Sequence, residues 1–329
     1  MKLLIDVDTG IDDALALLYA CASSDAELLG VTCTSGNVEG RQVATNTLAV
    51  LELAGRGDIE VALGREVPLV RPLDTAKETH GPQGIGHAVL PPPRAALSER
   101  HGADVIIETA RSMPGEVTLV TVAPLTNLAV ALQREPALPT LLRGVVMMGG
   151  VYRSPGNTTP TSEWNVAVDP EAMQVVLDGW AAYPQFGRPT ALGLDVTERA
   201  KMTPEHIARL EAAVGGEPGS NPVVRFIDDA LRFYMEFHSH FDGFYGAFIH
   251  DALAVAAALD PTLIEIESLH VQVELEGRHT TGQMVTDWRR LWGRPPNLDV
   301  AIEADVDTFF DRFIDRVAAL AAQRSNVAL

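Results

Sequence analysis

Short apolar runs alternate with amphipathic stretches over the first two hundred residues. The amphipathic stretches have helical spacing after Asp12, and again over residues 41–54 and 125–132. Strands that alternate with helices of this length favour crossover connections, and hence a parallel sheet with helices on both faces. The expected fold is therefore α/β with a mostly parallel central sheet. The apolar runs predict its strands at residues 3–5, 28–34, 116–123, 144–150 and 190–198.

The pattern changes towards the end of the chain. Residues 269–277 alternate between apolar and polar positions, and residues 281–288 follow after a turn. This predicts an antiparallel hairpin at the edge of the sheet. Apolar residues at helical spacing predict a packed terminal helix over residues 305–323.

No linker or internal repeat divides the chain, so we expect a single domain over residues 1–329. Two stretches rich in glycine and proline, residues 74–94 and 215–222, predict loops. Loops of this kind serve either as functional lids or as surface connections, and the sequence favours neither.

Composition narrows the classes of function. The chain has 25 Lys and Arg against 44 Asp and Glu, a net charge of −19. This charge argues against general binding to nucleic acids or anionic membranes, because both need a basic surface. Two cysteines exclude a disulfide scaffold, and the apolar surroundings of Cys21 and Cys33 predict core positions. Without a signal peptide or a membrane-spanning stretch, the expected location is the cytoplasm.

Four carboxylates lie within eight residues, between the first predicted strand and the first helix: Asp6, Asp8, Asp12 and Asp13. One acid in this position could simply cap the helix. Four acids so close together repel one another unless something neutralises them, and Ca²⁺ or Mg²⁺ prefers carboxylate oxygens. Gly10 is expected to let the backbone turn tightly so that the acids converge. The cluster therefore predicts a metal or catalytic site.

The acidic cluster is partly similar to two other kinds of site. An EF-hand loop counted from Asp6 would put Ile11 and Leu17 where it needs glycine and glutamate, so it is excluded. A phosphatase of the haloacid dehalogenase type begins with a strand and Asp-x-Asp, which Asp6 and Asp8 match, although Gly10 departs from that pattern. Asp6 would be its nucleophile. A third hypothesis is a sugar- or nucleoside-binding protein without catalysis.

Polar side chains also follow the other predicted strands. Ligands of open α/β sheets bind at the carboxyl ends of the strands. Taken singly, each of these residues is typical of a turn or a helix cap. Together they suit a polyhydroxylated ligand held around a cation, because amides and carboxylates bond hydroxyl groups. The residues are Asn37, Asn157, Glu163, Asn165, His250 and Asp251.

These motifs resemble a known family. DVDTGIDDALAL at residues 6–17 is similar to the signature of the nucleoside hydrolases, the inosine–uridine-preferring N-ribohydrolases. The resemblance continues in order through APLTN (123–127), MMGG (147–150), the loop from Asn157 to Asn165, and His250-Asp251. It implies a Rossmann-like single domain, one tightly bound Ca²⁺, and a homodimer or homotetramer. The implied reaction is hydrolysis of ribonucleosides to ribose and free base, with a metal-bound water activated by Asp8.

The resemblance also implies roles for individual residues. Asp8 would be the general base and would touch the metal, and His250 would be the imidazole near the base. Because imidazole titrates near neutral pH, His250 is also the expected proton donor. The implied metal ligands are Asp8, Asp13, Asp251 and a main-chain carbonyl near Val122. The implied substrate-binding residues are Asp12, Asn37, His80, Asn157, Glu163 and Asn165. Two departures stand out: Ala123 replaces the usual glycine, and residues 233–245, where the family contacts the base, carry many aromatic residues and histidines.

Overall fold

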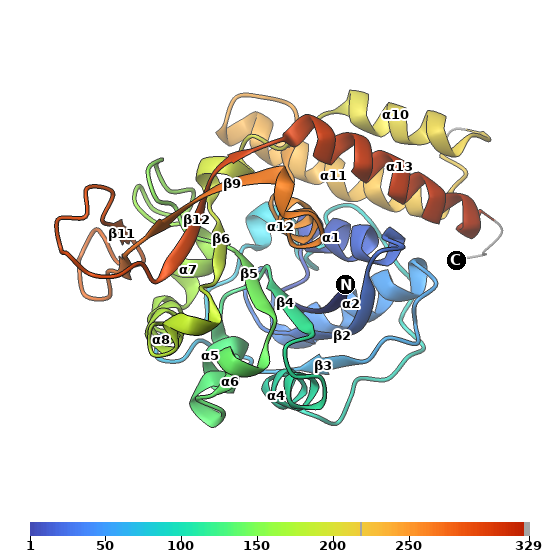
Figure 1. The fold of residues 1–329 in the computed structure, drawn as a ribbon. Helices are drawn as coiled ribbons and strands as arrows, with labels where there is room; N and C mark the ends of the chain where they lie inside the picture. The colour runs from blue at the N-terminus through green and yellow to red at the C-terminus, as the bar shows by residue number, and fades with distance from the viewer. Residues whose placement is uncertain (218, 326–329) are drawn as a thin grey trace.

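The computed structural model describes residues 1–217 and 219–325. An eight-stranded sheet with the order β3-β2-β1-β4-β5-β6-β12-β9 forms its centre (Figure 1). Seven strands run parallel, and β9 is antiparallel to β12 at one edge. The strands are β1 (Lys2–Val7), β2 (Glu27–Cys33), β3 (Val61–Leu63), β4 (Val117–Thr121), β5 (Gly144–Met148), β6 (Thr190–Leu192), β9 (Ile264–Leu269) and β12 (Leu298–Ala304).

Helices cover both faces of this sheet, as expected (Figure 1). The larger ones are α1 (Ile11–Ala22), α2 (Gly40–Leu53), α4 (Gly102–Ser112), α5 (Thr126–Arg134), α8 (Pro170–Ala181), α10 (Pro204–Val214), α11 (Pro222–Phe241), α12 (His250–Leu259) and α13 (Val306–Arg324). Shorter ones are α3 (Lys77–His80), α6 (Leu138–Leu141), α7 (Trp164–Val168), α9 (Leu194–Thr197), η1 (Pro184–Phe186) and η2 (Pro261–Leu263).

The alternation of β1 accounts for the two layers. Leu3 and Ile5 point to the face covered by α1, α2 and α12, whereas Leu4 points to the face covered by α4, α5 and α8. Both cores are apolar because a parallel sheet is buried on both sides. Helices α10, α11 and α13 pack against one another as a further group beside α1 (Figure 1).

The order of the first six strands is that of a doubly wound sheet. The chain moves outward from β1 to β3, returns to β4 on the other side of β1, and continues to β6. The switch point therefore lies between β1 and β4. A crevice opens outside the carboxyl ends of the two strands at such a point, and ligands bind there.

Two predictions about strands need correction. The strand expected over residues 190–198 ends at Leu192, because the chain turns into α9 after Gly193. The predicted hairpin exists as β10 (Val271–Val273) and β11 (Met284–Thr286), but it forms a separate two-stranded sheet. The antiparallel edge strand of the central sheet is β9, which the sequence did not predict. A second small pair joins β7 (Lys201–Met202) and β8 (Ala247–Phe248).

Both predicted loops connect helices or strands. Residues 74–94 contain only the short helix α3, which carries His80. Residues 215–222 connect α10 to α11, and Pro218 in this loop lies outside the described residues. Cys33 is buried as expected, whereas Cys21 is partly exposed.

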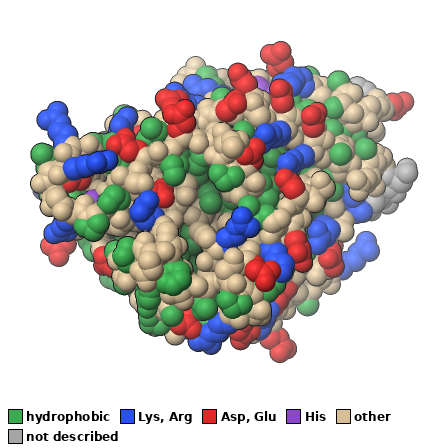
Figure 2. All heavy atoms as spheres, in the orientation of Figure 1, with side chains coloured by type: hydrophobic (Ala, Val, Ile, Leu, Met, Phe, Trp, Pro, Cys, Tyr) green, Lys and Arg blue, Asp and Glu red, His purple; other side chains and the backbone are tan. Residues whose placement is uncertain are grey.

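The visible surface carries charges of both signs. On the face shown in Figure 2, Lys and Arg side chains lie scattered among Asp and Glu side chains. Within residues 1–217 and 219–325, none of the helices has the length and apolar character needed to span a membrane.

Candidate active site

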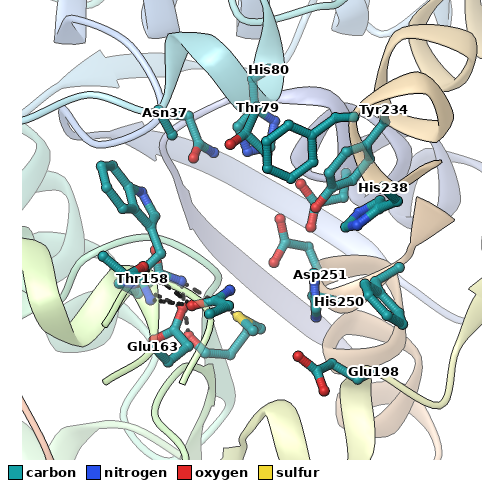
Figure 3. Close-up of a pocket in the computed structure, with 18 of the residues that line it drawn as sticks. Asn37, Thr79, His80, Thr158, Glu163, Glu198, Tyr234, His238, His250 and Asp251 are labelled. Carbon is teal, nitrogen blue, oxygen red and sulfur yellow. Dashed lines mark hydrogen bonds between the residues drawn. The ribbon is translucent and has the colours of Figure 1, made fainter. Parts of the chain in front are cut away.

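A cavity of about 440 Å³ opens at the carboxyl ends of the central strands (Figure 3). Its size is within the range of small-molecule sites. Most of the residues implied by the motifs line it, although they come from segments far apart in the sequence. They are Asp12, Asn37, His80, Val122, Asn157, Glu163, Asn165, His250 and Asp251. Asn157 is itself exposed, whereas the other side chains in this set are buried.

The turn after β1 places the acidic cluster. Asp13, in the first turn of α1, accepts hydrogen bonds from the backbone N–H of Asp8 (3.1 Å) and of Gly10 (2.9 Å). The Asn37 side chain donates to Asp13 Oδ2 (3.0 Å), and the Asn37 backbone N–H donates to Asp8 Oδ2 (2.8 Å). The turn after β2 is thereby joined to the turn after β1, and Asp8 and Asp13 lie directly beside the cavity wall.

Glycine is required at position 10 because a side chain would have no room there, and not because the backbone adopts a conformation that favours glycine. Its φ is −93°, a value open to any residue. A Cβ atom at this position would lie 2.6 Å from Asn37 Nδ2 and 2.6 Å from His80 Nδ1. The acids converge at this turn as expected, but the φ of Gly10 does not require glycine. Glycine is needed because two side chains of the site pass over its backbone.

The carboxylates fit a divalent cation. Oxygen atoms of Asp12, Asp13 and Asp251 lie within 4.8 Å of one another. Asp8 Oδ1 is buried and has no hydrogen-bond partner among the described residues. A buried polar atom without a hydrogen-bond partner costs free energy unless a ligand binds to it. Oxygen donors of this kind and density are those preferred by Ca²⁺ and Mg²⁺. The structure thus places Asp12, expected on the substrate, in the same group as the expected metal ligands Asp13 and Asp251.

Burial and mutual repulsion raise the pKa values of these acids. Burial raises the pKa of Asp12 to about 8, and the charge of Asp13 adds to the shift. Burial also raises the pKa values of Asp8 and Asp251 well above their usual range, with further contributions from neighbouring carboxylates. A bound cation would reverse this effect, because it favours the charged forms.

The opposite wall is built around Glu163, at the N-terminus of α7. Its carboxylate accepts hydrogen bonds from the backbone N–H groups of Gly150 (2.8 Å), Asn165 (2.8 Å) and Val166 (3.2 Å). Asn165 in turn donates to the carbonyl of Val122 (3.0 Å). Asn165, which was expected to bind the substrate, therefore orients the Val122 carbonyl, which was expected to bind the metal.

The two histidines implied by the motifs are buried and line the cavity. His80 accepts a hydrogen bond at Nδ1 from the backbone N–H of Ile11 (3.1 Å), so its neutral form carries the proton on Nε2. His250 Nδ1 lies 2.8 Å from the hydroxyl oxygen of Thr197. Burial lowers the pKa of each imidazole to about 3.

Asp6 does not fit the role of a phosphatase nucleophile. It is fully buried and does not line the cavity, and its side-chain partners Thr32 and Asn127 do not line it either, whereas Asp8 is bonded by Asn37 of the cavity wall. Its Oδ1 accepts hydrogen bonds from the Thr32 hydroxyl and from Asn127 Nδ2 (2.8 Å). Asn127 also donates to the carbonyl of Cys33 (3.0 Å). Asp6 therefore ties together the strands beneath the site.

Several residues of the cavity were not predicted from the sequence. Trp164 lies inside one of the family motifs but was given no role. Glu198 directly follows α9, at the end of the segment where a longer strand was expected, and was given no role. The segment 233–245 was noted only as a group, although five of its residues line the cavity, and three of them carry polar groups. These are Tyr234, His238 and Asp242.

Comparison with known proteins identifies the family. The model of the inosine-uridine preferring nucleoside hydrolases matches residues 3–311, which is nearly the whole chain. The chain belongs to the nucleoside hydrolase family. It is thus an enzyme of the N-ribohydrolase type, and the hypothesis of a binding protein without catalysis is wrong.

Relatives of this nucleoside hydrolase span its full length. It is 37% identical to an uncharacterised protein of Schizosaccharomyces pombe, covering 97% of this chain and 100% of the relative. It is 35% identical to the pyrimidine-specific ribonucleoside hydrolase RihA of Citrobacter koseri, covering 98% and 99%. A solved structure, the purine-preferring ribonucleoside hydrolase from Gardnerella vaginalis, superposes with a TM-score of 0.90 at 30% identity, covering 98% and 100%. Similar proteins thus carry names with opposite base preferences.

Proposed function

We propose that this chain is a Ca²⁺-dependent nucleoside N-ribohydrolase that releases ribose and free base from ribonucleosides. The observation that carries the proposal is the buried carboxylate group at the switch point of the sheet. Asp12, Asp13 and Asp251 converge there, and Asp8 has an unpartnered oxygen beside them. We propose no preference between purine and pyrimidine nucleosides.

The residues that would hold the cation are Asp8, Asp13, Asp251 and the Val122 carbonyl, with Asp12 in the same group. When bound, the cation would hold the ribose hydroxyls and lower the pKa of water. Asp8 is proposed to take the proton of the attacking water, because its Oδ1 is free while Oδ2 is fixed by the Asn37 backbone. Attack opposite the base inverts the anomeric carbon.

The remaining polar residues are proposed to bind the substrate. Asn37, Glu163 and Asn165 are each fixed by hydrogen bonds, so their free polar atoms are preorganised for the ribose hydroxyls. The buried carboxylates favour the positive charge that develops on the ribose ring. His80 and Asn157 are proposed to contact the substrate from the two rims of the cavity. His250 is proposed as a catalytic residue that hydrogen-bonds the departing base.

Release of reducing sugar tests this function. Inosine, uridine, cytidine and adenosine are incubated with the enzyme, with and without a strong chelator. We expect ribose release that stops on chelation and returns when Ca²⁺ is added. Release that continues after complete removal of divalent cations would overturn the metal assignment, and no release from any ribonucleoside would overturn the proposal.

Three further expectations stay predictions. We propose that residues 1–329 form one catalytic domain, that the enzyme acts in the cytoplasm, and that it assembles as a homodimer or homotetramer. Light scattering coupled to size-exclusion chromatography checks the assembly, because a monomer has the mass of one 35.3 kDa chain.

A further inference from the structure

The aromatic end of the cavity contains a histidine that none of the proposed steps uses. His238 lies on α11, one turn after Tyr234 and one turn before Asp242. Its ring centroid lies 4.6 Å from that of Tyr234, 4.7 Å from Phe248 and 5.6 Å from Phe244. In Figure 3, Tyr234 and His238 stand side by side on one wall, with His250 and Glu198 beneath them. His238 is 5% exposed.

This end of the cavity is suited to a nucleobase. The carboxylates that would hold the ribose lie around Asp12 and Asp251, so the planar and less polar part of a nucleoside must extend away from them. The side chains in that direction are aromatic: Tyr234, Phe237, Phe241 and Phe248. Flat aromatic surfaces pack well against a base. His238 lines this end of the cavity and is therefore placed beside the base and not the sugar.

His238 and Asp242 form an oriented pair. Nδ1 of His238 lies 2.6 Å from Oδ2 of Asp242. A carboxylate can only accept, so Nδ1 donates and the other nitrogen, Nε2, is left for a different partner. Nε2 is buried and has no hydrogen-bond partner among the described residues. Burying a polar atom without a hydrogen-bond partner costs free energy, which a bound ligand would recover.

The three histidines of the cavity differ in their partners. His80 is bonded by a backbone N–H, and His250 by the hydroxyl of Thr197. His238 is bonded by a carboxylate, which stabilises the protonated imidazolium. Burial lowers the pKa of His238 below its usual value, and the hydrogen bond and charge of Asp242 oppose this shift in part.

The wider surroundings of His238 contain charges of both signs. Glu198 is half-buried at the end of α9, and its carboxylate adds negative potential. The Lys201 ammonium lies 5.0 Å from the ring centre of Phe244 and opposes it. The titratable and charged groups that face His238 are Tyr234, Asp242, Glu198, Lys201, His80 and His250.

We propose that His238, oriented by Asp242, donates the proton that the nucleobase takes up as it leaves. The inference rests on the proposed ribohydrolase function. The bond between C1′ and the base nitrogen breaks, and its electron pair stays on the base. The proton on His238 Nε2 moves to the base, and water bonds to C1′ while its proton moves to Asp8. Exchange with solvent then returns His238 to imidazolium and Asp8 to carboxylate. His250 hydrogen-bonds the base during departure.

The test compares two leaving groups. Hypoxanthine and uracil need a proton to leave inosine and uridine, whereas 4-nitrophenolate leaves its riboside as a stable anion. We expect H238Q to lower kcat on inosine or uridine about 10²–10⁴-fold, the usual contribution of a general acid, and to leave the nitrophenyl riboside within about threefold. His240, two residues further on the same helix, is exposed, so H240Q is the matched control and should leave both substrates unchanged.

Asp242 is a positioning residue, and its test is a pH profile. D242N keeps a hydrogen-bonding side chain but removes the charge that favours imidazolium. The catalytic acid must be protonated, so activity on inosine is lost as pH rises through its pKa. D242N should move this alkaline limb to lower pH for inosine and leave the profile of the nitrophenyl riboside in place. A merely structural role would lower activity without moving the limb.

Each outcome decides the assignment. Equal losses on both substrates in H238Q, or no loss on either, would overturn the role of His238 as the proton donor. A selective loss in H250Q with none in H238Q would assign the proton to His250 instead. If the wild-type enzyme releases ribose from neither kind of substrate, the proposed function itself fails. Melting temperatures of all variants identify any that do not fold.

Discussion

Gly36 offers a sharp test of the geometry around the proposed general base. It lies in the turn after β2, against the carboxylate of Asp8. A Cβ atom at this position would lie 2.0 Å from Asp8 Oδ2 and 2.9 Å from Asp8 Cγ, with Pro124 Cδ 3.0 Å away. Real Cβ atoms do not approach other heavy atoms closer than 3.0 Å. G36A must therefore move Asp8 by about 1 Å relative to the backbone of the turn.

A displacement of about 1 Å in a catalytic group can lower the rate about 100-fold. We therefore expect G36A to reduce kcat on inosine by about this factor. The stability cost should stay near that of an overpacked core, about 1–3 kcal/mol, because one methyl group is added. Initial rates of ribose release give the first quantity, and urea unfolding gives the second.

The matched control is G144A. Gly144 is the first residue of β5, and a Cβ atom there would have nothing within 4 Å. This variant should keep both its turnover and its stability. A folded G36A enzyme with turnover within about threefold of wild type, less than 1 kcal/mol in activation free energy, would refute the reasoning. Asp8 would then not need the position that the structure gives it.

Three other predictions address the base, the cation and the support of the site. D8N should lower turnover at least about 10²–10⁴-fold without unfolding the protein, and near-normal ribose release would contradict the role of Asp8. Without metal, the Asp12 pKa of about 8 makes the folded protein bind more protons than the unfolded chain between about pH 4 and 8. The free energy of unfolding of the metal-free protein should therefore fall as pH rises through this window, and saturating Ca²⁺ should abolish this dependence. Thermal melts at several pH values, with chelator and with Ca²⁺, measure both effects. A melting temperature that does not change with pH in the presence of chelator would contradict the prediction. N127L should cost about 1–3 kcal/mol in urea unfolding, since Asp6 and the Cys33 carbonyl lose a buried donor, and unchanged stability would contradict that support.

The sequence predicted the repeating part of the fold well. Apolar periodicity and strand-ending turns gave β1, β2, β4 and β5 close to their observed bounds, because these strands are buried on both faces and leave a continuous apolar signal. The same periodicity predicted the terminal helix α13. Strand pairing across the chain was harder. The local pattern of residues 264–269 does not indicate that they pair with β12, which lies some thirty residues later.

For the candidate site, too, the sequence predicted one part and the tertiary structure was needed for the rest. Its polar residues follow strand ends, so their types and order along the chain were sufficient to predict one site and its class of chemistry. The sequence could not predict that Asn37 bonds both Asp8 and Asp13, or that Asp6 is withdrawn from the cavity. These facts depend on how the turns after β1 and β2 pack, which no spacing in the sequence records.

By itself, then, the sequence determined the α/β architecture, the family and the set of polar residues that meet at the switch point. Only the tertiary structure decided which carboxylates lie together, why Gly10 and Gly36 must lack side chains, and which histidine of the cavity has a charged partner. The physical reason is distance. Periodicity and motifs describe neighbours along the chain, whereas pKa values, close contacts and the His238–Asp242 pair in its aromatic enclosure depend on atoms that only folding brings together.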